Sequence, residues 1–143
     1  MVDERSVGTV VFLINAVTNV REYLLLQYTA RHWDFPKGNI EAGEKELDTA
    51  IRELHEETGI RDIVFLEGFR KTIDYHYRRA YKSVQKEVIY YIGKTSTHEV
   101  ILSNEHIEYT WETYHGALYQ LTYDNAKNLL KDAEFFIQNR SPL

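Results

Sequence analysis

The sequence has no cysteine, only two prolines and no apolar stretch of membrane-spanning length. Without cysteine there is no disulfide framework, no thiolate zinc site and no cysteine nucleophile. The apolar run from Val7 to Val17 is interrupted by Asn15 and falls far short of the ~20 residues that a membrane helix needs. Acidic Asp3 and Glu4 stand near the start, where a signal peptide carries positive charge. We therefore expect a cytoplasmic protein without a membrane partner.

Positive charge is also in short supply. The formal net charge is −5 over 143 residues, which argues against a general nucleic-acid binder. Hydrophobic residues make up 43% of the chain and charged residues 27%, as in ordinary globular proteins. At roughly 150 residues per domain, the length predicts one domain spanning residues 1–143. The composition is unusual in its 11 tyrosines, which suit flat, amphipathic contact surfaces.

The spacing of apolar residues predicts a mixed sheet lying between helices. We expect strands at 10–14, 23–28, 63–77, 84–93 and 107–111, a loop at 29–43 and a basic connection at 78–83. A helix is expected at 46–58, with Gly59 as its C-terminal cap and a core-facing stripe of Leu47, Ala50, Ile51 and Leu54. A second helix is expected at 122–139, with a stripe of Ala126, Leu129, Leu130, Ala133 and Ile137.

Charge is separated along the chain into an acidic and a basic segment. Residues 41–57 contain seven acidic and two basic residues, and residues 70–94 contain seven basic and two acidic residues. On composition alone, two solvated faces are the commoner explanation. An acidic segment and a basic segment together also suit the binding of a polyanion held partly through a divalent metal ion.

The acidic segment contains a dense motif. Gly38 is followed after five residues by Glu44, and after seven more by Arg52-Glu53-Leu54-His55-Glu56-Glu57-Thr58-Gly59-Ile60. On a helix, Glu53, Glu56 and Glu57 share one face. Oxygen ligands without histidine or cysteine favour Mg²⁺ or Mn²⁺ over zinc, and Arg52 can orient a carboxylate from outside the ligand set. Glycines at 38 and 43 are expected to permit a tight loop before the helix.

Residues 38–60 resemble the signature of the Nudix hydrolases without a departure. The resemblance implies an α/β/α sandwich with a mixed central sheet, and hydrolysis of nucleoside diphosphates linked to another group. Within that family, the segments 32–38, 67–69, 86–91 and 102–106 look like those of the asymmetric diadenosine tetraphosphate hydrolases. The chain departs from that subfamily at Asp34, Asn39 and Asn104, and its connection from Tyr75 to Lys86 is longer and more basic.

The resemblance also implies roles for individual residues. Metal would be bound by Glu53, Glu56, Glu57, the Gly38 carbonyl and Glu105, with Glu105 as the alternative general base. Glu44 is expected to orient Arg52 rather than to perform chemistry. The expected phosphate ligands are Lys37, Lys86 and Lys82, the last two together with Arg79. The expected base-binding residues are Tyr75, Tyr77, Tyr123 and His32.

The sequence leaves three hypotheses about function open. The first is a Mg²⁺- or Mn²⁺-dependent hydrolase that cuts diadenosine tetraphosphate into ATP and AMP. The second keeps the chemistry with another substrate, such as a damaged nucleoside triphosphate, ADP-ribose or a 5′-triphosphorylated RNA end. The third is a non-catalytic nucleotide sensor, against which the intact carboxylate cluster counts. The sequence leaves the oligomeric state open.

Overall fold

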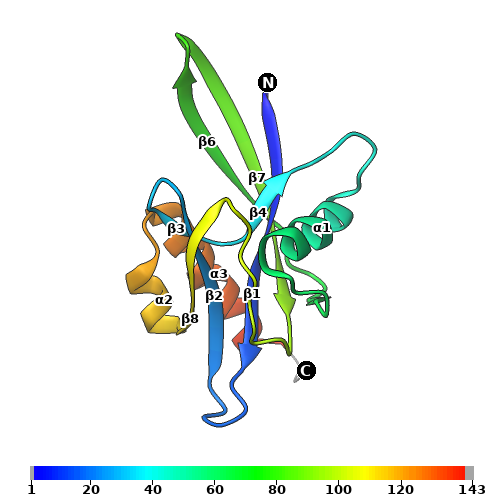
Figure 1. Ribbon diagram of the computed structural model, residues 1–143, viewed down its shortest axis with the longest axis vertical. Helices are drawn as coiled ribbons and strands as arrows, with labels where there is room; N and C mark the ends of the chain where they lie inside the picture. The colour runs from blue at the N-terminus through cyan, green and yellow to red at the C-terminus, as the bar shows by residue number, and fades with distance from the viewer. Residues whose placement is uncertain (1, 141–143) are drawn as a thin grey trace.

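The computed structural model describes residues 2–140, which build a mixed eight-stranded sheet around one long central strand (Figure 1). The central strand, β1, pairs in parallel with β7 along one edge and antiparallel with β4 and then β2 along the other. The strands are β1 (Glu4–Ile14), β2 (Arg21–Tyr28), β3 (Trp33–Asp34), β4 (Lys37–Asn39), β5 (Val64–Phe65), β6 (Lys71–Arg79), β7 (Lys82–Lys94) and β8 (His106–Thr113).

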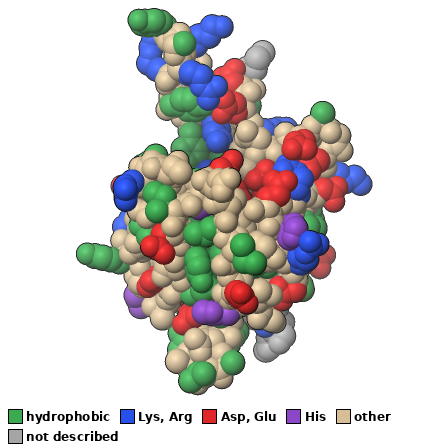
Figure 2. All heavy atoms as spheres, viewed as in Figure 1, with side chains coloured by type: hydrophobic (Ala, Val, Ile, Leu, Met, Phe, Trp, Pro, Cys, Tyr) green, Lys and Arg blue, Asp and Glu red, His purple; other side chains and the backbone are tan. Residues whose placement is uncertain are grey.

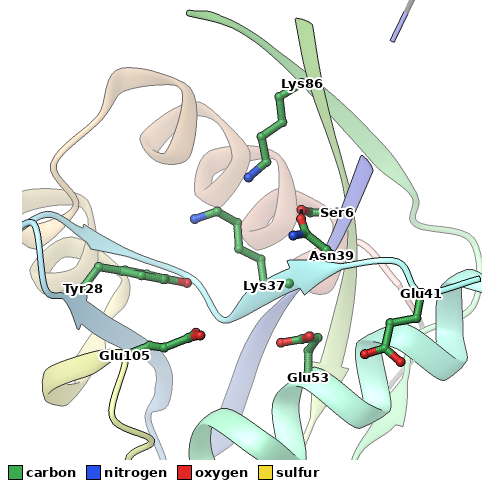
Figure 3. Close-up of a pocket in the computed structure, with 9 residues that line it drawn as sticks. Ser6, Tyr28, Lys37, Asn39, Glu41, Glu53, Lys86 and Glu105 are labelled. Atoms are coloured by element: carbon green, nitrogen blue, oxygen red, sulfur yellow. Dashed lines mark hydrogen bonds between the residues drawn. The ribbon is translucent and has the colours of Figure 1, made fainter. Parts of the chain in front are cut away.

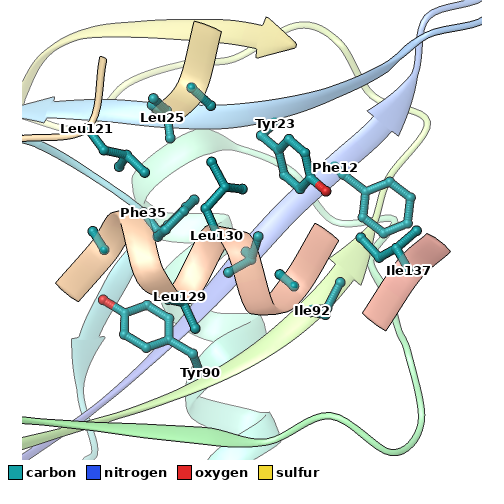
Figure 4. Packing of buried hydrophobic residues seen from close by; sticks show 14 of the residues in the cluster. Phe12, Tyr23, Leu25, Phe35, Tyr90, Ile92, Leu121, Leu129, Leu130 and Ile137 are labelled. Carbon is teal, nitrogen blue, oxygen red and sulfur yellow. The ribbon is translucent and has the colours of Figure 1, made fainter. Parts of the chain in front are cut away.

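Helices cover both faces of this sheet. Val10 and Phe12 of β1 pack in one apolar cluster with Leu129 and Leu130 of α3 (Asp124–Gln138). Figure 4 labels Phe12, Leu129 and Leu130 in this cluster. Val11, between them in sequence, packs on the opposite face with Leu54 of α1 (Glu46–Thr58). Because successive side chains of a strand alternate between faces, an uninterrupted apolar β1 serves both layers. The expected α/β/α arrangement is confirmed.

Helix α1 has the predicted bounds but not the predicted buried stripe. Gly59 ends it in the left-handed conformation with φ 77°, and its N–H donates to the His55 carbonyl. Ala50 and Leu54 are buried, whereas Leu47 and Ile51 are exposed. The buried face instead includes Thr49, Glu57 and Thr58, so the expected stripe was wrong at two of its four positions. The helix is rotated so that part of its acidic face points into the protein.

The expected strand at 63–77 is divided into β5 and β6, with residues 66–70 outside either strand. All five residues of the expected C-terminal stripe are buried in α3. The segment 29–43 contains the short strands β3 and β4, and a helix α2 (Tyr114–Gln120) precedes α3. The connection 78–83 is not an open loop, because β6 and β7 pair up to Arg79 and Lys82 and leave only a two-residue turn. Within residues 2–140, no helix is long and apolar enough to cross a membrane.

Candidate active site

Arg52 links the acidic residues of the motif. Its Nε donates to Glu44 Oε2 at 2.6 Å, and its Nη1 donates to Glu53 Oε1 at 2.7 Å. Nη1 also reaches Glu56 Oε2 at 3.2 Å, and Nη2 donates to the Asn39 carbonyl at 3.0 Å. The hydrogen bonds from Arg52 hold the pKa of Glu44 well below its usual range. Arg52 therefore fixes the middle of α1 against β4, the strand that carries Gly38.

Strand β4 passes so close to α1 that a side chain at position 38 would displace the Glu53 carboxylate. A Cβ on Gly38 would lie 1.9 Å from Glu53 Cδ, whereas atoms in van der Waals contact stand at about 3.5–4.0 Å. Gly38 is in an extended strand and is absent from the glycines with positive φ, unlike Gly43 with φ 84°. The expectation that Gly38 serves a tight loop was wrong, because its task is to admit the Glu53 carboxylate.

Glu57 is a buried carboxylate with one unsatisfied oxygen. Its Oε1 accepts from the Lys37 backbone N–H at 3.2 Å, and its Oε2 has no hydrogen-bond partner among residues 2–140. Burial, together with the negative charge of Glu53, raises the pKa of Glu57 well above its usual range. The His106 Nε2, also buried and without a hydrogen-bond partner in the described chain, stands 3.9 Å from Glu57 Oε1. Burial lowers the pKa of His106, which favours the neutral imidazole.

Beside these carboxylates is an open cavity of about 370 Å³. In Figure 3 the ammonium groups of Lys37 and Lys86 reach into it from one side, while the carboxylates of Glu53 and Glu105 face it from the other. Tyr28 forms part of the wall, with its hydroxyl donating to the Phe35 carbonyl at 2.8 Å. The cavity therefore offers oxygen ligands and cationic groups to the same occupant, as a metal-bound polyphosphate requires.

The oxygen atoms at this site are of the kind that bind a divalent cation. The unpartnered Oε2 of Glu57, the carboxylates of Glu53 and Glu105 and the backbone of Gly38 supply oxygen alone, which suits hard cations. As the side chains stand, no three acidic or imidazole groups of residues 2–140 converge into a metal-binding cluster. Glu56 is held on the outer side by Arg52, with its side chain 55% exposed. Its role as a ligand stays a prediction.

A second, smaller cavity of about 170 Å³ adjoins the first. Aromatic rings dominate its lining, which consists of His32, Asp34, Lys37, Tyr75, Tyr77, Lys86 and Tyr123. Lys37 and Lys86 line both cavities, so the two form one continuous site. The His32 ring stacks on Tyr28 at 4.8 Å and lies 5.5 Å from the ring of Tyr123.

The lysine at the junction is held by a carboxylate. Asp34 is 2% exposed, and its Oδ2 accepts from Lys37 Nζ at 3.1 Å. Lys37 Nζ also stands 4.5 Å from the ring centroid of Tyr28. Burial and the positive charge of Lys37 lower the pKa of Lys86. An anionic phosphate between these two lysines would relieve that repulsion.

The structure brings together most of the expected substrate residues but leaves Lys82 out. Lys82 pairs with Arg79 beside the exposed turn, four residues along the strand from Lys86, or about 13 Å away. It lines neither cavity, so its expected contact with the distal phosphates, together with Lys86 and Arg79, stays a prediction. Sequence reasoning missed the lining residues Ser6, Tyr28 and Glu41. The sequence singled out Asp34 and Asn39, which also line the cavities, only as departures from the subfamily.

The chain is similar to known proteins along most of its length. A family model described as the NUDIX domain matches residues 4–133. The asymmetrical bis(5′-nucleosyl)-tetraphosphatase of Rattus norvegicus is 36% identical over 143 residues, covering 93% of this chain and 95% of the rat protein. The Sus scrofa protein of that name has the same identity and coverage.

A solved structure shows the same architecture. The Ap4A hydrolase of C. elegans, crystallised as a binary complex, superposes with a TM-score of 0.84 at 30% identity. The match covers 96% of this chain and 99% of the C. elegans chain. The similarity therefore extends well beyond the acidic motif, into the strands and helices that build both cavities.

Proposed function

This chain belongs to the NUDIX family, and from that premise we propose that it hydrolyses dinucleoside polyphosphates, cutting diadenosine tetraphosphate into ATP and AMP. Nudix hydrolases generally depend on a divalent metal ion. The observation that carries the proposal is the junction of a carboxylate-lined cavity with an aromatic cavity through Lys37 and Lys86. One nucleoside and a chain of phosphates fit such a site.

The proposed cation is Mg²⁺ or Mn²⁺, bound by Glu53, Glu56, Glu57, Glu105 and the Gly38 carbonyl. When bound, such an ion supplies Lewis acidity and lowers the pKa of a coordinated water. Arg52 and Glu44 hold Glu53 in place through hydrogen bonds of 2.7 and 2.6 Å. Glu105 also lines the cavity, which supports a role either as ligand or as acceptor of the water proton.

The chain's own residues position the substrate. Lys37 and Lys86 are proposed to contact the phosphates, since charge-assisted hydrogen bonds are about twice as strong as neutral ones. Tyr75 and Tyr123 are proposed to enclose one base, with His32 and Tyr77 at its edges. Cleavage of a phosphoanhydride needs mainly such positioning and charge stabilisation, with little covalent chemistry by the protein.

A substrate panel tests this proposal. We expect kcat/KM to be highest for diadenosine tetraphosphate, lower for a nucleoside triphosphate and lowest for ADP-ribose, because the two lysines contact a longer phosphate chain in the first. Higher kcat/KM for ADP-ribose would contradict the proposed substrate class while leaving hydrolysis intact. Binding of every nucleotide without turnover would favour a sensor and contradict the proposed function.

A further inference from the structure

The β6–β7 hairpin extends well beyond the body of the protein (Figure 1). Strand β1 pairs with β7 from Lys86 inward, so the outer part of the hairpin is a two-stranded ribbon. Figure 2 shows Lys and Arg side chains gathered over this projection. An isolated two-stranded ribbon is marginally stable in water, and a third strand beside it adds stability.

Strand β6 leaves one edge of this ribbon open. Within residues 2–140, β6 pairs only with β7, so the backbone groups along its other edge have no strand opposite them. Natural proteins often protect such an edge by making the strand very short or by placing a proline or a bulge in it. Strand β6 is nine residues long, contains no proline and keeps an unbroken register with β7. Its backbone can therefore pair with another strand.

Two charges on one face of β6 lack a counter-charge. Asp74 directly opposes Glu87 of β7, and like charges in that position destabilise a sheet. Glu87 is paired with Arg5 at 3.0 Å, whereas Asp74 forms no ion pair with any described residue. Arg78, four positions along the same strand, likewise has no carboxylate partner in the part of the chain that the structure describes. Residues an even number of positions apart share a face of the strand, so both charges lie on the same side.

We propose that the protein forms a symmetric dimer through β6, in which two copies of this strand pair antiparallel about a twofold axis at His76. Residues equally far from His76 on either side then face each other, so Asp74 opposes the partner's Arg78. Twofold symmetry produces this pair twice, because the same surface serves both copies. Opposite charges placed directly across a sheet stabilise the pairing of its strands. The dimer goes beyond the proposed hydrolysis and does not depend on it.

The antiparallel arrangement also keeps the two basic tips apart. The tip of each ribbon lies beside the base of the other, so Arg79 and the partner's Arg79 are separated by six residues along the strands, or about 20 Å. Repulsion over that distance is largely screened at physiological salt, where the Debye length is about 8 Å. On the other face of the joined sheet, Tyr75 opposes the partner's Tyr77. Because Tyr75 lines the aromatic cavity, the partner contributes an aromatic side chain next to that cavity.

Sedimentation equilibrium of the full chain at low salt tests the dimer. One pair of strand edges is a small interface beside the roughly 1,200–2,000 Å² of stable complexes, so we expect a reversible dimer with a Kd on the order of 100 µM. Asp74→Arg and Arg78→Asp each place like charges across both pairs, and each should raise this Kd about tenfold or more. The variant with both substitutions restores opposite charges in the same register. Its Kd should return to within about threefold of the wild-type value.

A loss of dimer in Asp74→Arg is not a loss of folding. Within one chain, this substitution replaces the like charge that faces Glu87 by an opposite one, so the hairpin of the monomer should be at least as stable as before. Thermal melts at a protein concentration well below the dimer Kd should therefore give a Tm no lower than that of the wild type.

A matched control uses Arg61, an exposed residue that follows α1 and lies outside the hairpin. Arg61→Asp changes the net charge as much as Arg78→Asp does and should leave the dimer Kd unchanged. A wild-type protein that stays monomeric up to about 1 mM would leave the edge of β6 to a strand of another protein and overturn the inference. Equal weakening by Arg61→Asp and Arg78→Asp, or a double variant that stays monomeric, would overturn it as well.

Discussion

Gly38→Ala should abolish most of the activity while the fold survives. The added Cβ would meet Glu53 Cδ at 1.9 Å, Oε2 at 2.0 Å and Cγ at 2.5 Å, and real Cβ atoms essentially never come within 3.0 Å. The Glu53 carboxylate must therefore withdraw by about 1 Å. Misplacement on that scale costs about 10²-fold in rate, or about 2.7 kcal/mol of transition-state stabilisation.

Stability should change little in the same variant. Weakening the hydrogen bond from Arg52 to Glu53 costs about 1 kcal/mol, and replacing glycine in an extended strand returns about 0.4–1 kcal/mol through the unfolded chain.

Gly43→Ala is the matched control, because its φ of 84° is strained for alanine but nothing lies within 4 Å of the new Cβ. It should lower Tm by about 2–8 °C, from roughly 1–2 kcal/mol of strain, with kcat unchanged. Steady-state kinetics and thermal melts of both variants decide the matter. Wild-type kcat in Gly38→Ala would refute the reasoning.

Four further predictions follow from the same contacts. Arg52→Lys loses the guanidinium group that hydrogen-bonds both Glu44 and Glu53, so kcat should fall at least tenfold with a smaller change in KM. An unchanged kcat would show that Glu53 does not need Arg52 to hold its position. Tyr123→Ala should raise KM about tenfold and Tyr123→Phe should be nearly silent, because the ring carries the stacking; equal damage by Phe would implicate the hydroxyl. Lys86→Gln should lower kcat/KM more for a tetraphosphate than for a diphosphate substrate, since one charge-assisted hydrogen bond contributes ~1.5–3 kcal/mol, and equal losses would show that Lys86 does not sense chain length. Because the pKa of Glu57 is raised to about 9 in the folded chain, the metal-free protein should lose stability as pH rises from about 4.5 to 9. Thermal melts should show that Tm depends less on pH in Glu57→Gln than in the wild type. An equally steep dependence of Tm on pH in that variant would contradict the assignment of this effect to Glu57.

Local sequence signals predicted the long elements well. The bounds of α1 followed from apolar spacing and Gly59, and the buried stripe of α3 followed from its own periodicity. The short helix α2 was missed, because Gly116 weakens its helical pattern and the Thr113 hydroxyl that caps it was not weighed. The turn at Ala80 and Tyr81 carries neither Gly nor Asn, so the usual hairpin signal was absent.

Long-range contacts explain what sequence reasoning missed at the site. Gly38 is 15 positions from Glu53 in the sequence, and only the pairing of β4 with β1 brings them together. The spacing of Glu53, Glu56 and Glu57 predicted one acidic face, but it did not distinguish the buried Glu57 from the exposed Glu56. That difference arises from the rotation of α1 against β4. The apolar side chains of Leu47 and Ile51 predicted a different rotation, because they were expected to be buried and are exposed.

The most direct test of the account is product analysis of diadenosine tetraphosphate after incubation with the protein. With Mg²⁺ present, chromatography should show ATP and AMP in equal amounts, and with a chelator in its place the dinucleotide should persist. Two molecules of ADP as the product, or equal turnover with and without the cation, would contradict the proposed reaction and the role of its carboxylates.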